Sequence, residues 1–425
     1  MDILAQLAPD HRAGRPTGIV SVCSAHRIVL RAALAQGRAQ GTPVLIEATC
    51  NQVNQDGGYT GMTPAGFRAF VEDIAREVGF DPKGLILGGD HLGPNPWKHL
   101  PFEAAFAKAD AMMAEFVAAG FGKIHLDCSM GCAGEPEALD DETTALRAAR
   151  LARIAERVAQ EEGLAARLYI IGTEVPTPGG ATHALEGLVP TAPEAARKTL
   201  ATHRRIFAEA GLEAALGRVI GMVVQPGVEF GHEDVIAYNP ERARALVGLL
   251  EDEPRLVFEA HSTDYQTEGH LHDLVGDGFA ILKVGPGLTF ALREALYGLD
   301  LVAGALDPDY GDRPLWRAME ALMLAEPGHW QKYYPGTPAE QAVLRHYSYS
   351  DRIRYYWPRP EAEQAVRRLM AALEGRALPE PLLSQFLPRA ADAVRAGTLA
   401  PEAPAILEHA VRHVLDQYAR AARQA

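Results

Sequence analysis

The stretch Gly18–His26 reads GIVSVCSAH, an apolar, β-branched run followed by a turn that contains no glycine. Short runs of this kind are typical of strands in a parallel sheet, because helices cover both faces of such strands. An open, doubly wound sheet would usually carry a glycine fingerprint at this first turn into a helix. The turn sequence therefore favours a closed barrel over an open sheet.

Seven further runs of the same kind occur before residue 290, separated by longer segments of helical period such as 102–120 and 143–162. Apolar residues in those segments recur at i, i+3 and i+4, as in helices that pack on the outside of a barrel. Eight strands alternating with helices predict an α/β fold, a (β/α)8 TIM barrel. The predicted strands are Gly18–Cys23, Val44–Ala48, Leu85–Asp90, Lys123–Asp127, Arg167–Glu174, Arg218–Gln225, Arg255–Ala260 and Phe279–Val284.

The strand pattern stops after about residue 305, and helical pattern with proline breaks follows. We therefore predict two parts, a barrel over 1–305 and a helical C-terminal extension over 306–425 that packs on the barrel. Within the extension, His346–Pro358 (HYSYSDRIRYYWP) places aromatic residues among arginines. We interpret this segment as packing against the barrel's own helices, with docking of a partner as the alternative.

The composition excludes several classes of partner and location. The formal net charge is −14 and no long basic run is present, which argues against nucleic acid and anionic membranes. Four cysteines in 425 residues do not form a disulfide framework and indicate a reducing compartment. No apolar stretch reaches the roughly 18 residues needed to span a bilayer, and the first residues do not resemble a signal peptide. We therefore expect a cytoplasmic protein.

Polar residues gather at the carboxyl ends of the predicted strands, where the catalytic residues of such barrels lie. Buried carboxylates and imidazoles cost several kcal/mol when unpaired, so converging ones usually neutralise one another, bind a metal or perform acid–base chemistry. All of the predicted strands but the first end in such groups. These residues are Glu47, Asp90, His91, His125, Asp127, Glu174, Gln225, Glu229, His232, Glu259, His261 and Lys283.

Three histidines, His91, His232 and His261, follow strands three, six and seven. Neutral imidazoles from separate strands can converge on one divalent cation and leave positions for substrate oxygens. We expect zinc first, although manganese, cobalt and nickel also suit such ligands. On strand four, either His125 or Asp127 faces the mouth, depending on where the strand ends. Cys128 and Cys132 are interpreted as buried thiols.

Long motifs throughout the chain resemble the tagatose-1,6-bisphosphate aldolase accessory-subunit family. They are SVCSAH (21–26), IEATCNQVNQDGGYTGMTP (46–64), LGGDHLGPN (87–95), KIHLDCSM (123–130), GTEVPTPGG (172–180), VVQPGVEFGH (223–232), EAHSTDYQT (259–267), ILKVGPGLTFALREA (281–295) and SDRIRYYWP (350–358). Members from enteric bacteria are regarded as non-catalytic partners of a class II aldolase subunit. Related proteins act as metal-dependent epimerases at C4 of ketohexoses or their phosphates.

The family resembles class II aldolases distantly, and by that resemblance the zinc histidines fall on His91, His232 and His261. In class II aldolases the loop after strand seven contains glycines that cradle a C1 phosphate. Here the loop 262–266 contains none, and Asp264 would repel a phosphate. Gly285 and Gly287 precede a predicted helix and can offer backbone N–H groups to an anion.

The resemblance implies retro-aldol and aldol chemistry at C4 of a tagatose- or fructose-type sugar. Asp90 would remove the C4 hydroxyl proton, with Glu174 or Asp127 as its counterpart on the other face. The expected substrate-binding residues are Glu47, Asn51, Gln52, Gln225 and Lys283. We favour an enzyme with a small sugar as substrate. The alternative is a non-catalytic subunit that stabilises a class II aldolase, and a homo-oligomer is compatible with either.

Overall fold

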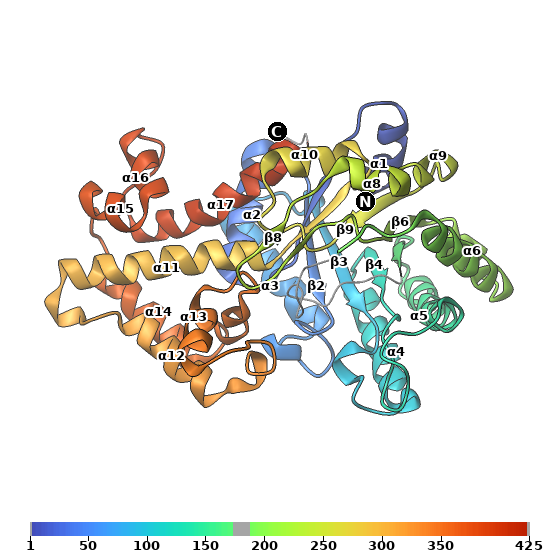
Figure 1. Ribbon diagram of the computed structural model, residues 1–425, viewed down its shortest axis with the longest axis horizontal. Coiled ribbons are helices and arrows are strands. Elements are labelled where there is room, and N and C mark those ends of the chain that lie inside the picture. The colour runs from blue at the N-terminus through green and yellow to red at the C-terminus, as the bar shows by residue number, and fades with distance from the viewer. Residues whose placement is uncertain (1, 173–187, 423–425) are drawn as a thin grey trace.

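A computed structural model describes residues 2–172 and 188–422 of the chain (Figure 1). Eight parallel strands close into a barrel in the order β1-β10-β9-β6-β5-β4-β3-β2. The predicted TIM barrel and its eight strands are therefore confirmed, with ends that shift by a few residues. The strands are β1 (Ile19–Val22), β2 (Val44–Thr49), β3 (Leu85–Leu92), β4 (Lys123–Leu126), β5 (Leu168–Ile171), β6 (Val219–Val223), β9 (Val257–Ala260) and β10 (Ile281–Val284).

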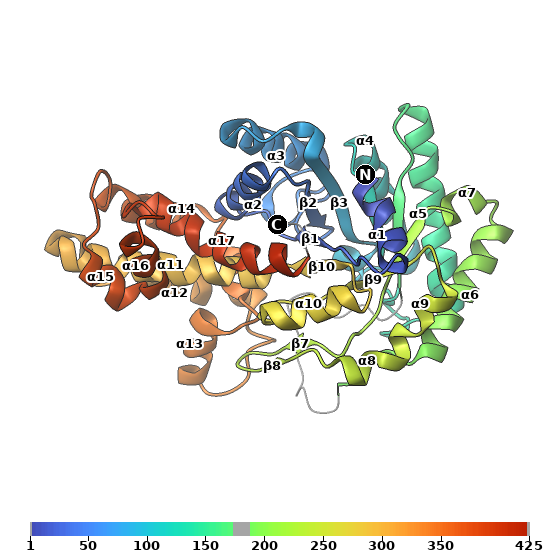
Figure 2. The ribbon, with the colours of Figure 1, turned by 90° about the horizontal axis from the view of Figure 1, so that it is seen from above.

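Helices follow the strands and surround the barrel, as Figure 2 shows from above. They are α2 (Arg27–Gln40), α3 (Pro64–Val78), α4 (Phe102–Ala118), α5 (Asp141–Glu161), α6 (Pro193–Glu209), α7 (Glu213–Leu216), α8 (Pro240–Val247), α9 (Leu249–Asp252), α10 (Glu268–Gly276) and α11 (Pro286–Leu306). Local sequence sets their ends. Helix α3, for example, begins where the Thr63 side chain accepts the Gly66 N–H, and it ends at Gly79 in the left-handed region.

Helix α1 (Asp2–Arg12) and a hairpin outside the barrel sheet were not predicted from the sequence. Helix α1 places Leu4 and Leu7 in a buried cluster with inward-facing strand residues such as Ile19 and Ile281, and so closes the barrel at the amino ends of its strands. A short antiparallel hairpin of β7 (Glu229–Phe230) and β8 (Val235–Ile236) follows β6. This hairpin changes the position of one predicted metal ligand.

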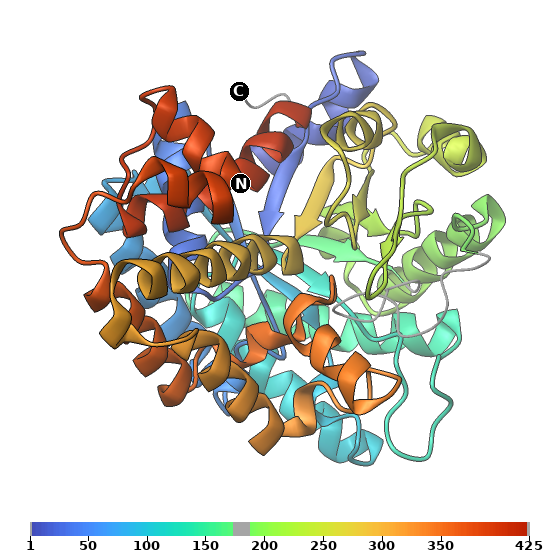
Figure 3. The same ribbon diagram turned by 60° about the vertical axis from the view of Figure 1, so that its left-hand side comes forward.

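After α11 the described residues form helices joined by loops, without a strand, and these helices lie on one side of the barrel (Figure 3). They are α12 (Pro314–Ala325), α13 (Pro338–Tyr347), α14 (Pro360–Ala372), α15 (Glu380–Phe386), α16 (Pro388–Arg395) and α17 (Ala403–Ala421). Helix α17 returns to the barrel and packs against α2, α10 and α11. On this basis we propose that the barrel spans residues 1–305 and the helical extension spans residues 306–425. None of the described helices has the length and apolar character to cross a membrane.

Candidate metal centre and active site

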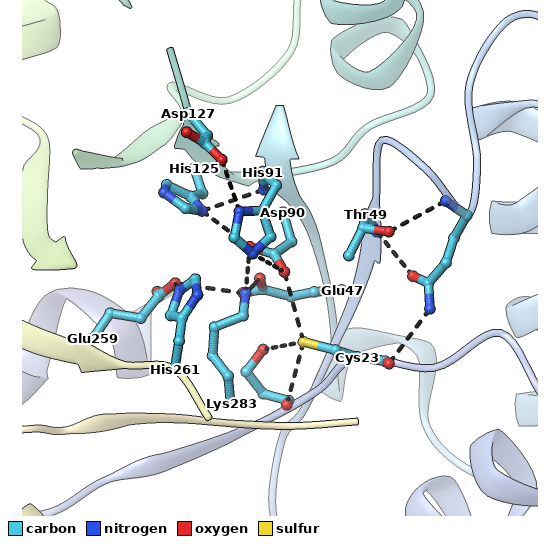
Figure 4. A network of polar contacts seen from close by, with 12 residues as sticks. Cys23, Glu47, Thr49, Asp90, His91, His125, Asp127, Glu259, His261 and Lys283 are labelled. Carbon is cyan, nitrogen blue, oxygen red and sulfur yellow. Dashed lines mark hydrogen bonds and ion pairs between the residues drawn. The ribbon is translucent and has the colours of Figure 1, made fainter. Parts of the chain in front are cut away.

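A layer of buried charged side chains lies in the barrel interior below its mouth, and Figure 4 shows Glu47, Glu259 and Lys283 of this layer. The Lys123 ammonium lies 2.5 Å from Glu47 Oε1 and 2.7 Å from Glu259 Oε2, and all three side chains are fully buried. The Lys283 ammonium lies 2.6 Å from Glu47 Oε2 and 2.6 Å from Asp90 Oδ1. Burial lowers the pKa of Lys283, but these carboxylates outweigh it and raise that pKa well above its usual value. Lys283 is therefore charged and fixes Asp90 at the mouth.

Four side chains converge above this layer, and their potential ligand atoms all lie within 4.8 Å of one another. They are Asp90, His91, His125 and His261. Two consecutive residues of β3 reach the same cluster because the register of β3 against β4 shifts between Gly89 and Leu92. His91 itself has a φ of 50°, a strained conformation for a residue with a side chain. Strain of this kind concentrates at functional sites.

The surroundings of the three rings bear on metal binding. Burial lowers the pKa of His261 to about 3, so its imidazole is neutral. The Nε2 atom of His125 is buried and has no hydrogen-bond partner among the described residues. Burial also lowers the pKa of His91, but Asp90 and Asp127 outweigh this effect and raise that pKa. The two carboxylates therefore favour a positive charge at this position, on the ring or on a cation bound there. Three imidazoles and a carboxylate at this spacing form a candidate site for a divalent cation.

Carboxylates outside the cluster hold two of these rings in place. Asp127 Oδ2 lies 2.8 Å from His91 Nδ1, and Glu259 Oε1 lies 2.9 Å from His261 Nε2. The other nitrogen of each ring is the one available to a metal, and in His91 it lies 3.7 Å from Asp90 Oδ2. Carboxylate partners of this kind fix the orientation of metal-binding histidines and increase their basicity.

The structure does not place His232 with the other two predicted metal ligands. His232 lies in the turn between β7 and β8, where its Nδ1 is 3.1 Å from Ser348 Oγ and its ring packs against Tyr334. The unpredicted hairpin is the physical reason. His125, which faces inward from β4, lies in the cluster instead.

The other predicted site residues divide into three groups. Asn51, Gln52, Asp90 and Lys283 line a cavity of about 90 Å³ beside His91 and His261. Glu47 and Gln225 do not line it. Glu47 is bound by the two lysines, and Gln225 Oε1 accepts the N–H groups of Gly227 and Val228. Asp127 is also absent from its lining, and Glu174 lies outside the described residues.

Other residues line the same cavity but were not predicted from the sequence. They are Cys23, Thr49, Tyr59, Asp264, Arg354 and Tyr355, together with backbone and apolar neighbours. Arg354 and Tyr355 belong to the aromatic segment 346–358, so this segment contributes to the barrel mouth and is not only packing. Its mixture of arginine and aromatic residues was the only sequence signal for this contribution.

An acidic side chain accepts hydrogen bonds from the backbone N–H groups at the start of α11. Asp264 Oδ1 accepts the N–H of Gly285 at 3.0 Å and that of Gly287 at 2.7 Å. Burial raises the pKa of Asp264 to about 6. The two glycines therefore bind an anionic group, as expected, but this group is the Asp264 carboxylate of the protein itself and not a ligand.

Comparison with known proteins shows the family of the chain. A curated protein from Agrobacterium fabrum (strain C58), named D-tagatose 6-phosphate 4-epimerase, is 59% identical over 416 residues, which cover 98% of this chain and 97% of the relative. The crystal structure of a probable tagatose 6 phosphate kinase from Sinorhizobium meliloti 1021 has a TM-score of 0.89 and 56% identity, and the match covers 95% of this chain and 100% of the other. A model of one family matches residues 4–423. The chain belongs to this family, the D-tagatose-1,6-bisphosphate aldolase subunit GatZ/KbaZ-like proteins.

Proposed function

We propose that the chain is a metal-dependent 4-epimerase that interconverts ketohexose 6-phosphates of the tagatose and fructose type. The observation that carries this proposal is the cluster of Asp90, His91, His125 and His261 beside a cavity at the barrel mouth. The name of the Agrobacterium relative, which is similar over nearly the whole chain, supports the choice of substrate.

We propose zinc as the metal, held by His91, His125 and His261. A bound divalent cation supplies Lewis acidity that polarises the C2 carbonyl of the sugar. The buried carboxylates Asp127 and Glu259 hold two of the rings toward it.

Asp90 is the proposed base. Burial raises its pKa, but His91 and Lys283 outweigh this effect and hold it well below the usual value, so the carboxylate is ionised. It accepts the C4 hydroxyl proton while the C3–C4 bond breaks and its electron pair moves toward C2. The products are the enediolate of a three-carbon ketone and glyceraldehyde 3-phosphate. The aldehyde turns its other face, the electron pair of the enediolate re-forms the C3–C4 bond, and a carboxylic acid on that face protonates the new C4 oxygen. The proton held by Asp90 then returns to that acid through solvent. We propose Glu174 as the group that serves this second face.

The test is turnover by the isolated, zinc-loaded chain. D-tagatose 6-phosphate alone, without nucleotide or a second subunit, should give D-fructose 6-phosphate, followed by NMR, and EDTA should stop the reaction. Phosphorylation that requires ATP would replace the proposal with a kinase. Aldol cleavage that appears only after addition of a class II aldolase subunit would favour a stabilising role.

Replacement of Asp90 by asparagine should lower kcat about 10²- to 10⁴-fold, the usual contribution of a positioned general base. The three histidines proposed to hold the metal remain, and asparagine keeps a side-chain oxygen beside them, so mass spectrometry should still find metal in the variant. Near-normal turnover would show that another group removes the proton.

A further inference from the structure

A second cavity of about 430 Å³ adjoins the one at the metal cluster. The two share Cys23, Gln52, Tyr59, Gly285 and Arg354 in their linings. Cavities that hold metabolites usually measure about 300–1,000 Å³, so the smaller cavity alone is too small for a hexose phosphate. Part of the substrate must therefore extend into the second cavity.

This second cavity carries an excess of positive charge. Three arginines line it, Arg27, Arg354 and Arg367, against a single carboxylate, Glu363. The first turn of α2 also lines it and adds the partial positive charge of a helix amino end. The lining is therefore suited to a phosphate group.

Arg354 is the arginine best placed for a ligand. Its guanidinium donates to the carbonyls of Ser350 and Asp351 and, at 2.9 Å, to the Tyr355 hydroxyl. These contacts orient it between the two cavities. Among the described residues it forms no ion pair with a carboxylate. Arg27 and Arg367, by contrast, pair with Glu77 and Glu363.

The other candidate position for a phosphate is occupied. The amides of Gly285 and Gly287, at the start of α11, already bind the Asp264 carboxylate. A second anion there would meet a buried negative charge. The C1 end of the substrate is therefore expected to carry a plain hydroxyl.

We propose that the second cavity binds the C6 phosphate of the substrate, with Arg354 as its main contact and Arg367 as an outer one. This inference rests on the proposed function. Cleavage between C3 and C4 leaves the phosphate on the aldehyde fragment. This fragment must rotate so that its other face meets the enediolate, and it must do so without leaving the active site. A phosphate held by Arg354 retains that fragment while its carbonyl end rotates, so the bond can re-form on the other face.

The test compares Arg354→Met with Arg359→Met, an exposed arginine just before α14 that lines neither cavity. Loss of a charged hydrogen bond should weaken binding about 10- to 100-fold. Isothermal titration calorimetry with D-fructose 6-phosphate should show this loss for Arg354→Met only. Its kcat/KM for D-tagatose 6-phosphate should fall by a similar factor, and by clearly more than its kcat/KM for free D-tagatose.

Arg354 also holds backbone carbonyls, so Arg367→Glu provides a second variant with an exposed side chain. It should weaken binding of the sugar phosphate several-fold, and by more than it weakens binding of the free sugar. Equal losses for phosphorylated and free sugars, or unchanged binding of D-fructose 6-phosphate in both variants, would overturn the phosphate site. If D-fructose 6-phosphate binds in a way that depends on Arg354 but the wild type shows no turnover, the epimerase function is rejected and the phosphate site is retained.

Discussion

Replacement of His91, His125 or His261 by alanine is expected to remove the bound metal and, with it, the epimerase activity. Each change deletes one of three imidazoles in a cluster whose ligand atoms lie within 4.8 Å of one another. Removing a carboxylate that only orients a metal ligand typically costs about 10–100-fold in metal affinity or activity, and loss of a ligand itself should cost more. Metal content by mass spectrometry and turnover of D-tagatose 6-phosphate measure both effects.

His232→Ala is the matched control for these three variants. Its ring packs on Tyr334 and its Nδ1 contacts Ser348, outside the cluster. This variant should retain a full complement of metal. Loss of metal from His232→Ala, with retention in His125→Ala, would contradict the cluster and restore the ligand set expected from the sequence. Circular dichroism establishes that each variant is folded.

Lys123→Met is expected to destabilise the protein by about 3–5 kcal/mol, the usual cost of breaking a buried ion pair by removing one partner. Lys123 lies between Glu47 and Glu259 in a fully buried part of the barrel. Its removal leaves two carboxylates with only Lys283 between them. The penalty should shrink as the pH falls, because protonation of one carboxylate relieves the repulsion.

Denaturant unfolding of Lys123→Met should be compared with that of Lys198→Met. Lys198 pairs with Asp141 at 3.1 Å, but its side chain is 73% exposed. Exposed pairs contribute about 0–1 kcal/mol, so this control should unfold almost like the wild type. Similar unfolding of both variants would mean that the buried layer adds little net stability.

The barrel was predictable because each strand is a short apolar run bounded by helical segments, and this pattern depends only on local sequence. The metal cluster was predictable in part. His91 and His261 stand at strand ends, which meet at one edge of any such barrel. The third histidine of the cluster is His125 and not His232, because the hairpin of β7 and β8 holds His232 away from it. This hairpin could not be predicted, since strands of two residues leave almost no pattern in a sequence.

The phosphate-binding residues were harder to anticipate for a different reason. Arg354 follows no barrel strand, and it reaches the mouth only because the extension folds back over the barrel. An arginine among aromatic residues also fits ordinary packing, as in the Arg352 side chain that lies over Tyr333. Composition cannot separate these roles, since the difference lies in which cavity the side chain lines.

Helix α1 seals the lower end of the cylinder with Leu4 and Leu7. Together with the buried ion pairs above it, this packing leaves only the upper rim as the side from which sugar can reach and leave the site. Each turnover then requires the epimerised sugar to leave before a new molecule can enter. We expect the two epimers to compete for the free enzyme, so net conversion should slow as product accumulates, well before the mixture reaches equilibrium.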